Sequence, residues 1–285
     1  MGKILVTGAL GNVGGYVASK AIGLGQQIVV GDISVERLKE RYQERAEAVY
    51  FDFTKPETFK SALVGVDRVF IMRPPHLGKP EDLKPFIDEL AKQKMQLVCF
   101  LSLIGIEHNP VPPHYKIEKF IEAANLPYCH IRPSFIMQNI SGVHAFEIKH
   151  FNRIVVPVKK AKTSFIDAED IGELIAFVLS HPQDHQNRGY SITGGEALDY
   201  FEVAKILTEE LGRDIVYADP SPREAKNYWI NIRGLDKAYS TVMSMLYMMT
   251  RMGTAKQTTV TFEEIMRKKP QTLAQFAKKN RSAWE

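Results

Sequence analysis

The chain has 285 residues, of which 45% are hydrophobic and 25% are charged. These proportions are ordinary for a folded globular protein and argue against a disordered or fibrous one. The small excess of 37 basic over 33 acidic residues argues against a nucleic-acid-binding protein. No signal-peptide segment follows Met1 and no run of about 18 apolar residues occurs. Cys99 and Cys129 lie in apolar runs, which favours reduced core thiols, so we expect a cytoplasmic protein that does not span a membrane.

Short apolar runs alternate with helix-like stretches over the first half of the chain. The predicted strands cover residues 3–7, 27–31, 48–51, 68–72, 96–101 and 128–132. Apolar residues three and four positions apart predict helices over residues 15–24, 35–45, 56–63, 79–94 and 115–124. Continuous apolar strands are typical of a parallel sheet that is buried on both faces. The pattern therefore predicts an α/β fold with a doubly wound parallel sheet of the Rossmann type.

The pattern changes in the second half. The next elements predicted are a strand at 163–166, a helix at 168–180, a strand within 189–194, a helix at 201–211 and a short strand at 214–217. Beyond residue 223 only a possible strand at 258–262 interrupts helix-like sequence, and residues 235–252 are rich in Met, Tyr and Leu. We expect a Rossmann domain over residues 1–187 and a smaller, mostly helical substrate or cap region over residues 188–285, partly interleaved with it.

The segment TGALGNVGG follows the first predicted strand and opens the first predicted helix, with glycines at positions 8, 11 and 14. At such a turn the chain bends sharply, a diphosphate approaches backbone N–H groups, and the helix packs closely on the sheet. The unpaired N–H groups and the dipole at the helix start favour a pyrophosphate. Gly8, Gly11 and Gly14 therefore predict an NAD-like dinucleotide site, with a simple tight turn as the competing interpretation.

Two acidic residues follow the second and third predicted strands. Asp32 is placed to accept hydrogen bonds from the adenosine ribose and to repel a 2′-phosphate, which favours NAD(H) over NADP(H). Arg37 and Lys39 lie close by and could contact a phosphate, so NADP(H) stays open. Asp52 is placed near the adenine edge, with a helix-cap or turn role as the alternative.

The chain also resembles the NmrA-like branch of the atypical short-chain dehydrogenase/reductases nearly from end to end. The resemblance rests on VTGALGNVGG, on LSLIG followed by HYKIEKFIEAANLPYCHIRPSFIMQN, on SFIDAEDIGELIAFVL, on GYSITGGEALDYFEVAKIL and on the final QTLAQFAKKNRSAW. It implies an extended-type Rossmann fold and an NAD(P)H-dependent oxidoreductase that passes hydride to a small acceptor, for example a quinone-like or aromatic one. The alternative is a regulatory protein that senses nicotinamide dinucleotides without turnover.

The resemblance also implies a catalytic pair, one member of which is missing. In these dehydrogenases a Tyr-x-x-x-Lys pair moves the proton. If Lys116 is the lysine, the place of the tyrosine falls on Pro112. We expect Lys116 to contact the nicotinamide ribose and His114 to be the nearest candidate proton donor. The competing interpretations are an exposed His114 and a surface Lys116 balanced by Glu118 or Glu122.

The remaining predicted site residues lie at or just beyond strand ends. Ser102 matches a serine near the nicotinamide, and Arg73 is placed to pair with the pyrophosphate or to remain solvated. The full predicted cofactor set is Gly8, Gly11, Asn12, Val13, Gly14, Asp32, Asp52, Phe53, Arg73, Ser102, Lys116, Pro133 and Phe135. The predicted substrate set is Ile104, Phe135, Met137 and Asn139, with core packing as the alternative for the Phe and the Met. We expect no metal, a small-molecule substrate as partner, and a monomer or homodimer.

Overall fold

A computed structural model describes residues 2–285, and the chain forms two compact units. The first unit comprises Met1–Pro133 and Ala168–Ile192, and the second comprises Ser134–Asp167 and Thr193–Glu285. The chain thus leaves the first unit once, returns for one helix and one strand, and then stays in the second. Among residues 2–285 no helix is both long and apolar enough to cross a membrane.

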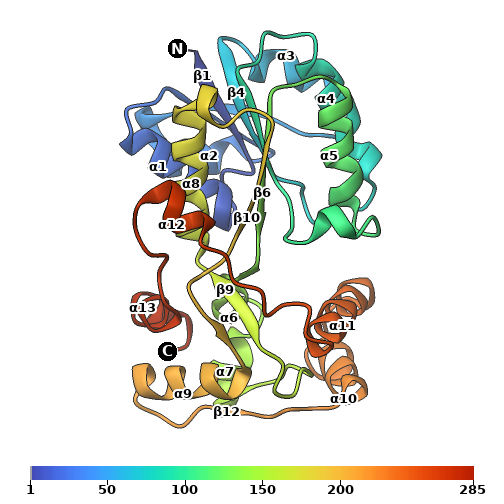
Figure 1. Ribbon diagram of the computed structural model, residues 1–285, viewed down its shortest axis with the longest axis vertical. Coiled ribbons are helices and arrows are strands. Elements are labelled where there is room, and N and C mark those ends of the chain that lie inside the picture. The colour runs from blue at the N-terminus through green and yellow to red at the C-terminus, as the bar shows by residue number, and fades with distance from the viewer. Residues whose placement is uncertain (1) are drawn as a thin grey trace. The chain divides into compact units, whose positions relative to one another are not determined.

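Seven parallel strands form the sheet of the first unit (Figure 1). In chain order they are β1 (Lys3–Thr7), β2 (Ile28–Asp32), β3 (Glu47–Tyr50), β4 (Val66–Ile71), β5 (Leu97–Leu101), β6 (Tyr128–Pro133) and β10 (Arg188–Ile192). Their order across the sheet is β10-β6-β5-β4-β1-β2-β3. The chain therefore winds from β1 to one edge and then returns past β1 toward the other edge. This order confirms the predicted doubly wound α/β fold.

Helices cover both faces of this sheet (Figure 1). On one side lie α1 (Asn12–Gly23), α2 (Val35–Tyr42) and α8 (Ala168–Ser180), and on the other lie α3 (Phe59–Ala62), α4 (Lys84–Leu90) and α5 (Pro113–Ala123). Strand residues such as Leu5, Val69 and Val98 join the α3–α5 side in one buried cluster. On the other side α8 approaches α1 closely, because a Cβ at Gly172 would lie 2.4 Å from the Cβ of Tyr16. Short 3-10 helices complete the unit: η1 (Gln43–Arg45), η2 (Pro56–Thr58), η3 (Pro80–Leu83), η4 (Ile106–His108) and η5 (Pro182–Asp184).

The second unit combines short strands with most of the C-terminal helices. Its strands are β7 (Phe135–Ile136), β8 (Arg153–Ile154), β9 (Thr163–Ile166), β11 (Ala197–Leu198) and β12 (Val216–Tyr217). Its helices are α6 (Gln138–Ser141), α7 (Ala145–Phe151), α9 (Tyr200–Leu211), α10 (Pro222–Asn227), the π-helix η6 (Tyr228–Ile232), α11 (Lys237–Arg251), α12 (Thr261–Met266), α13 (Leu273–Lys279) and η7 (Arg281–Ala283). They surround a core that includes Trp229, Phe276 and Trp284.

The structure differs from the sequence-based expectation at three places. Residues 134–167 belong to the second unit, because β9 pairs with β7 and β11 and not with the seven-stranded sheet. In the opposite direction, β10 lies past the expected boundary at residue 187 yet pairs with β6 in the first unit. The possible strand at 258–262 does not form: Thr259 donates its N–H to the hydroxyl of Thr193 at 2.9 Å, and α12 begins at Thr261. Local strand propensity therefore gives way here to the tertiary contacts of the segment.

Candidate functional site

The turn between β1 and α1 forms the centre of the candidate site. Gly8 has a φ of +63°, in the left-handed region that glycine adopts at little cost. The N–H of Gly11 donates to the Gly8 carbonyl at 2.9 Å. A Cβ at Gly14 would lie 2.3 Å from the same carbonyl oxygen, so that only glycine permits this approach of helix to strand. Gly8 and Gly14 thus meet the backbone demands of a sharp turn and a close helix contact, while the approach of a diphosphate at Gly11 stays a prediction.

The start of α1 is open to an anion. Gly11 occupies the N-cap and provides no side-chain cap, and the first turn contains no acidic residue. Asn12 is exposed and Val13 packs into the core. The first N–H groups of a helix have no partner within it, and the helix dipole is positive there. Such a terminus is suited to a phosphate group.

Helix α2 supports the glycine turn from the side. The hydroxyl of Tyr42 donates to the carbonyl of Ala9 at 2.6 Å, and Nη1 of Arg41 donates to the carbonyl of Leu10 at 3.3 Å. The Arg41 guanidinium lies against Gly15, where a Cβ would come within 2.4 Å of Nη2. Arg41 was not among the predicted site residues, because only the fold brings this end of α2 beside the turn.

The acidic residues after β2 and β3 have different surroundings. Asp32 is partly buried at the carboxyl end of β2, next to the strand that leads into the glycine turn. The Asp52 carboxylate accepts hydrogen bonds from the N–H and the hydroxyl of Thr54 at 2.9 and 2.7 Å. Burial opposes ionisation, but these bonds keep the pKa of Asp52 below its usual value. Phe53 is buried, with its ring 4.8 Å from that of Phe51 in an aromatic cluster. Asp52 therefore stabilises a turn and Phe53 packs in the core, while their contacts with a cofactor stay predictions.

Three side chains near the carboxyl ends of β4 and β5 carry buried polar atoms without a hydrogen-bond partner. Arg73 donates to two carbonyls of its own loop through Nη1, but its Nε is unpaired. Ser102 follows β5 directly, and its hydroxyl makes no hydrogen bond of ordinary geometry. His114 lies in the first turn of α5 with an unpaired Nδ1, and its ring stacks on Phe100 at 5.9 Å. Unpaired buried polar atoms cost free energy unless a ligand or water completes them, so these three residues are candidates for contact with a ligand.

The protonation state of His114 follows from this environment. Burial lowers its pKa to about 4, the positive charge of Arg73 acts in the same direction, and the carboxylate of Glu118 opposes them. The imidazole is therefore neutral at physiological pH and offers one N–H donor. A neutral imidazole can donate a hydrogen bond, but it is a much weaker acid than an imidazolium.

The side chain of Lys116 does not join these buried groups but lies at the surface. Its side chain is 60% exposed, and its ammonium lies 3.7 Å from the Glu81 carboxylate. The buried side of α5 carries Ile117 and Glu118 instead. The expected contact between Lys116 and a nicotinamide ribose stays a prediction. The ionic partner that the structure gives this lysine is Glu81, whereas Glu118 and Glu122 have other cationic partners.

The structure contains a buried ion pair behind the site that was not predicted from the sequence. The Glu118 carboxylate accepts hydrogen bonds from Nε and Nη2 of Arg132 at 3.0 and 2.7 Å. Burial opposes ionisation of Glu118, but these bonds lower its pKa, and Ser102 beside it acts in the same direction. Arg132 passes over Gly189, where a Cβ would lie 3.0 Å from the guanidinium carbon. The sequence did contain a signal for this pair: Glu118 and Arg132 are charged residues at core-facing positions of a predicted helix and a predicted strand.

The same region brings together residues that could bind a metal. Ligand atoms of Glu118, Glu122 and His130 lie within 4.8 Å of one another. However, Arg132 occupies both oxygens of Glu118, and the ammonium of Lys119 lies 2.6 Å from the Glu122 carboxylate. Because both carboxylates already have cationic partners, we assign no metal to this cluster.

The predicted substrate residues divide between the two units. Ile104 is partly buried after β5, and its N–H donates to the Pro133 carbonyl at 3.1 Å. In the second unit, Phe135 and Asn139 are partly buried, while Met137 packs in the core. Of the predicted substrate residues, only Ile104 therefore lies in the unit that contains the glycine turn.

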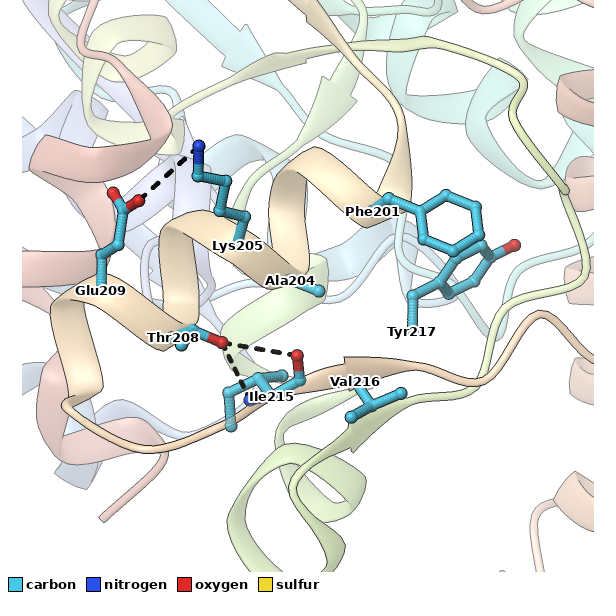
Figure 2. Close-up of a pocket in the computed structure, with 8 residues that line it drawn as sticks. All are labelled: Phe201, Ala204, Lys205, Thr208, Glu209, Ile215, Val216 and Tyr217. Carbon is cyan, nitrogen blue, oxygen red and sulfur yellow. Dashed lines mark hydrogen bonds and ion pairs between the residues drawn. The ribbon is translucent and has the colours of Figure 1, made fainter.

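The second unit has a groove of its own between α9 and β12 (Figure 2). It has a volume of about 390 Å³, and the rings of Phe201 and Tyr217 meet edge to face at 4.9 Å on one wall. Thr208 joins the two elements, because its hydroxyl accepts the N–H of Ile215 at 2.9 Å (Figure 2). None of the predicted site residues is among those that line this groove.

Comparison with known proteins places this geometry in a family. The sequence pattern of the NmrA-like family matches residues 1–277. Prestalk A differentiation protein A of Dictyostelium discoideum is 30% identical over 97% of this chain and 91% of its own length. NAD(P)H azoreductase of Xenophilus azovorans is 24% identical over 99% of both chains.

Solved structures share the fold. Triphenylmethane reductase of a Citrobacter species, in its complex with NADP(H), matches with a TM-score of 0.88 at 21% identity. The match covers 98% of this chain and 100% of that chain. At this level of identity the similarity shows the fold alone.

Proposed function

The chain belongs to the NmrA-like family, and from this premise we propose that it is an NAD(P)H-dependent oxidoreductase that passes hydride to a small organic acceptor. The observation that carries the proposal is the glycine turn, where a Cβ at Gly14 would lie 2.3 Å from the Gly8 carbonyl oxygen. Relatives named as an azoreductase and an oxidoreductase support the same class of reaction.

The residues of the first unit fit a dinucleotide. The open start of α1 would hold the pyrophosphate through the backbone N–H groups of Asn12 and Val13. The unpaired groups of Arg73, Ser102 and His114 would complete the nicotinamide end. These donors lie near the carboxyl ends of β4 and β5, where ligands bind in open α/β sheets.

The missing tyrosine limits the class of acceptor. Pro112 stands at its place, directly before α5, and the neutral His114 does not supply a strong acid in its stead. A reduced nicotinamide, when bound, supplies the hydride, so the protein has to orient the acceptor and exclude water. Acceptors that do not depend on an enzymic acid fit this site: quinones, cationic dyes and iminium ions. His114 is the candidate hydrogen-bond donor to an acceptor oxygen, and Arg73 favours negative charge there.

We further propose that both dinucleotides bind. Asp32 favours NADH, as expected from its place at the end of β2. Arg41 lies beside the glycine turn, with its guanidinium 3.3 Å from the Leu10 carbonyl, and provides a positive charge for a 2′-phosphate. The expectation of NAD(H) rested on Asp32 alone and did not take Arg41 into account.

A cofactor-sensing protein without turnover is the second candidate. Two observations favour it: the proline at the tyrosine's place, and a 30% identical relative that is named as a differentiation protein and not as an enzyme. This candidate requires dinucleotide binding but no oxidation of the reduced form with any acceptor.

One experiment separates these candidates. The purified chain is mixed with NADH or NADPH, and nicotinamide oxidation is followed against quinones, azo dyes, cationic dyes and iminium ions. The proposal predicts oxidation that needs both protein and acceptor and that disappears in Gly11→Val. Binding without oxidation across the panel would favour the sensor, and the absence of binding would reject both candidates.

A further inference from the structure

Helix α11 exposes most of its large apolar side chains. Its buried side carries Ser240, Met243, Tyr247 and Thr250. The exposed side chains, with their exposed fractions, are Tyr239 (44%), Val242 (64%), Met245 (58%), Leu246 (41%), Met248 (43%), Met249 (36%) and, just beyond the helix, Met252 (67%). From residue 237 to residue 252 only Lys237 and Arg251 are charged. A surface helix normally turns its apolar stripe toward the core, so this face indicates a partner.

The spacing of the exposed residues indicates what kind of partner. Ala238, Val242, Met245, Met249 and Met252 follow one another at intervals of four, three, four and three residues. This is the seam by which one helix packs against another, with apolar residues at the a and d positions of a heptad. The flanking positions 239, 241, 246 and 248 are uncharged, so no ionic pattern selects a different chain.

The area of the face matches what a stable dimer needs. Weighted by their exposed fractions, the seven large side chains offer about 700 Å² on one copy. If all these side chains were covered, two copies would bury at most about 1,400 Å², which reaches the range of roughly 1,200–2,000 Å² that is typical of stable interfaces.

We propose that α11 is the interface of a symmetric homodimer, in which it packs antiparallel against α11 of a second copy. A two-fold axis at Met245 places Ala238, the smallest residue of the seam, opposite Met252, one of the largest. A two-fold interface uses the same patch on both subunits, and antiparallel helices align their dipoles favourably. The inference concerns the second unit alone and stands apart from the proposed reaction.

A matched pair of substitutions tests the interface. Val242 and Val64 are both 64% exposed, but Val64 lies in the first unit whereas α11 belongs to the second. The mass of the full chain in solution is measured by sedimentation and light scattering over a range of concentrations. We expect a dimer for the wild type and for Val64→Glu, and at least a tenfold weaker dimer for Val242→Glu. A monomeric wild type, or a dimer that Val242→Glu leaves unchanged, would overturn the proposal.

Cysteine cross-linking tests the geometry in a chain that keeps its apolar face. Met245→Cys should form a disulfide with its own copy under mild oxidation, because it lies at the axis. Ala238→Cys should cross-link only when mixed with Met252→Cys, while the native Cys99 and Cys129 are buried. Self-linking of Ala238→Cys would contradict the antiparallel arrangement. A monomer that binds anionic phospholipid vesicles through this face would assign it to a lipid surface instead.

Discussion

The close contact between α1 and β1 makes a quantitative prediction for Gly14→Ala. The new Cβ would lie 2.3 Å from the Gly8 carbonyl oxygen and 2.8 Å from its carbonyl carbon, so the helix must move outward by about 1 Å. Overpacking of this kind costs about 1–3 kcal/mol, and the better helix propensity of alanine offsets up to about 1 kcal/mol of it. We expect a net loss of about 1–2 kcal/mol in the free energy of unfolding, and a melting temperature lower by about 2–8 °C.

Gly11→Ala is the matched control at the same turn. Gly11 has a φ of −78°, and its added Cβ would meet the flexible end of Met72 at 3.1 Å and the Gly8 carbonyl oxygen at 3.3 Å. Both contacts are looser than those at Gly14, so its stability should change by less than about 1 kcal/mol. Dinucleotide binding should weaken at least tenfold, about 1.4 kcal/mol, because the methyl group occupies the approach of the pyrophosphate. Thermal unfolding and calorimetric titration with NADPH measure the two effects. A Gly14→Ala protein as stable as the wild type, or a Gly11→Ala protein that binds normally, would refute the reasoning.

Three further predictions follow from other parts of the first unit. Asp32→Ala should increase the preference for NADPH over NADH about tenfold, about 1.4 kcal/mol, and Arg41→Ala should increase the preference for NADH by a similar factor. Ratios of the two dissociation constants that stay unchanged in titrations would contradict these roles. Burial lowers the pKa of His130 from 6.5 to about 4, so the unfolded chain takes up the proton first and stability falls as the pH drops from about 6.5 to about 4. His130→Phe should reduce that fall by about 1–3 kcal/mol in denaturant titrations, and an unchanged pH dependence would count against it. Lys116→Met should weaken nicotinamide binding by about 1–3 kcal/mol if the lysine contacts the ribose; normal binding and turnover would leave it as a surface partner of Glu81.

The sheet and the glycine turn could be predicted because their signals are local. An apolar run shows a buried strand, and the spacing of Gly8, Gly11 and Gly14 reports backbone demands within one turn. The division of the chain into two units, in contrast, has no local signal. Residues 134–167 leave the first unit because β9 finds its partners in β7 and β11, and no feature within β9 specifies that choice.

The side-chain environment of the site also could not be predicted from the sequence. Arg41 reaches the glycine turn only because α2 ends beside it, and the burial of Glu118 depends on Arg132 from a later strand. The same rotation of α5 that turns Glu118 inward turns Lys116 outward. Each helical residue is rotated by about 100° from the one before it, so Lys116 and Glu118 point in nearly opposite directions. The spacing of apolar residues fixes only approximately which side of the helix faces the sheet.

Transfer of a labelled hydride tests the central claim most directly. NADPH that carries deuterium at both positions of C4 of the nicotinamide is mixed with the protein and a cationic triphenylmethane dye, and the colourless product is examined by mass spectrometry. Hydride addition to the central carbon of the dye forms a C–H bond that does not exchange with water and needs no proton from the protein. The account predicts deuterium in the product with the wild type and none with Gly11→Val. A protein that binds NADPH but transfers no deuterium to this dye or to an iminium acceptor would contradict it.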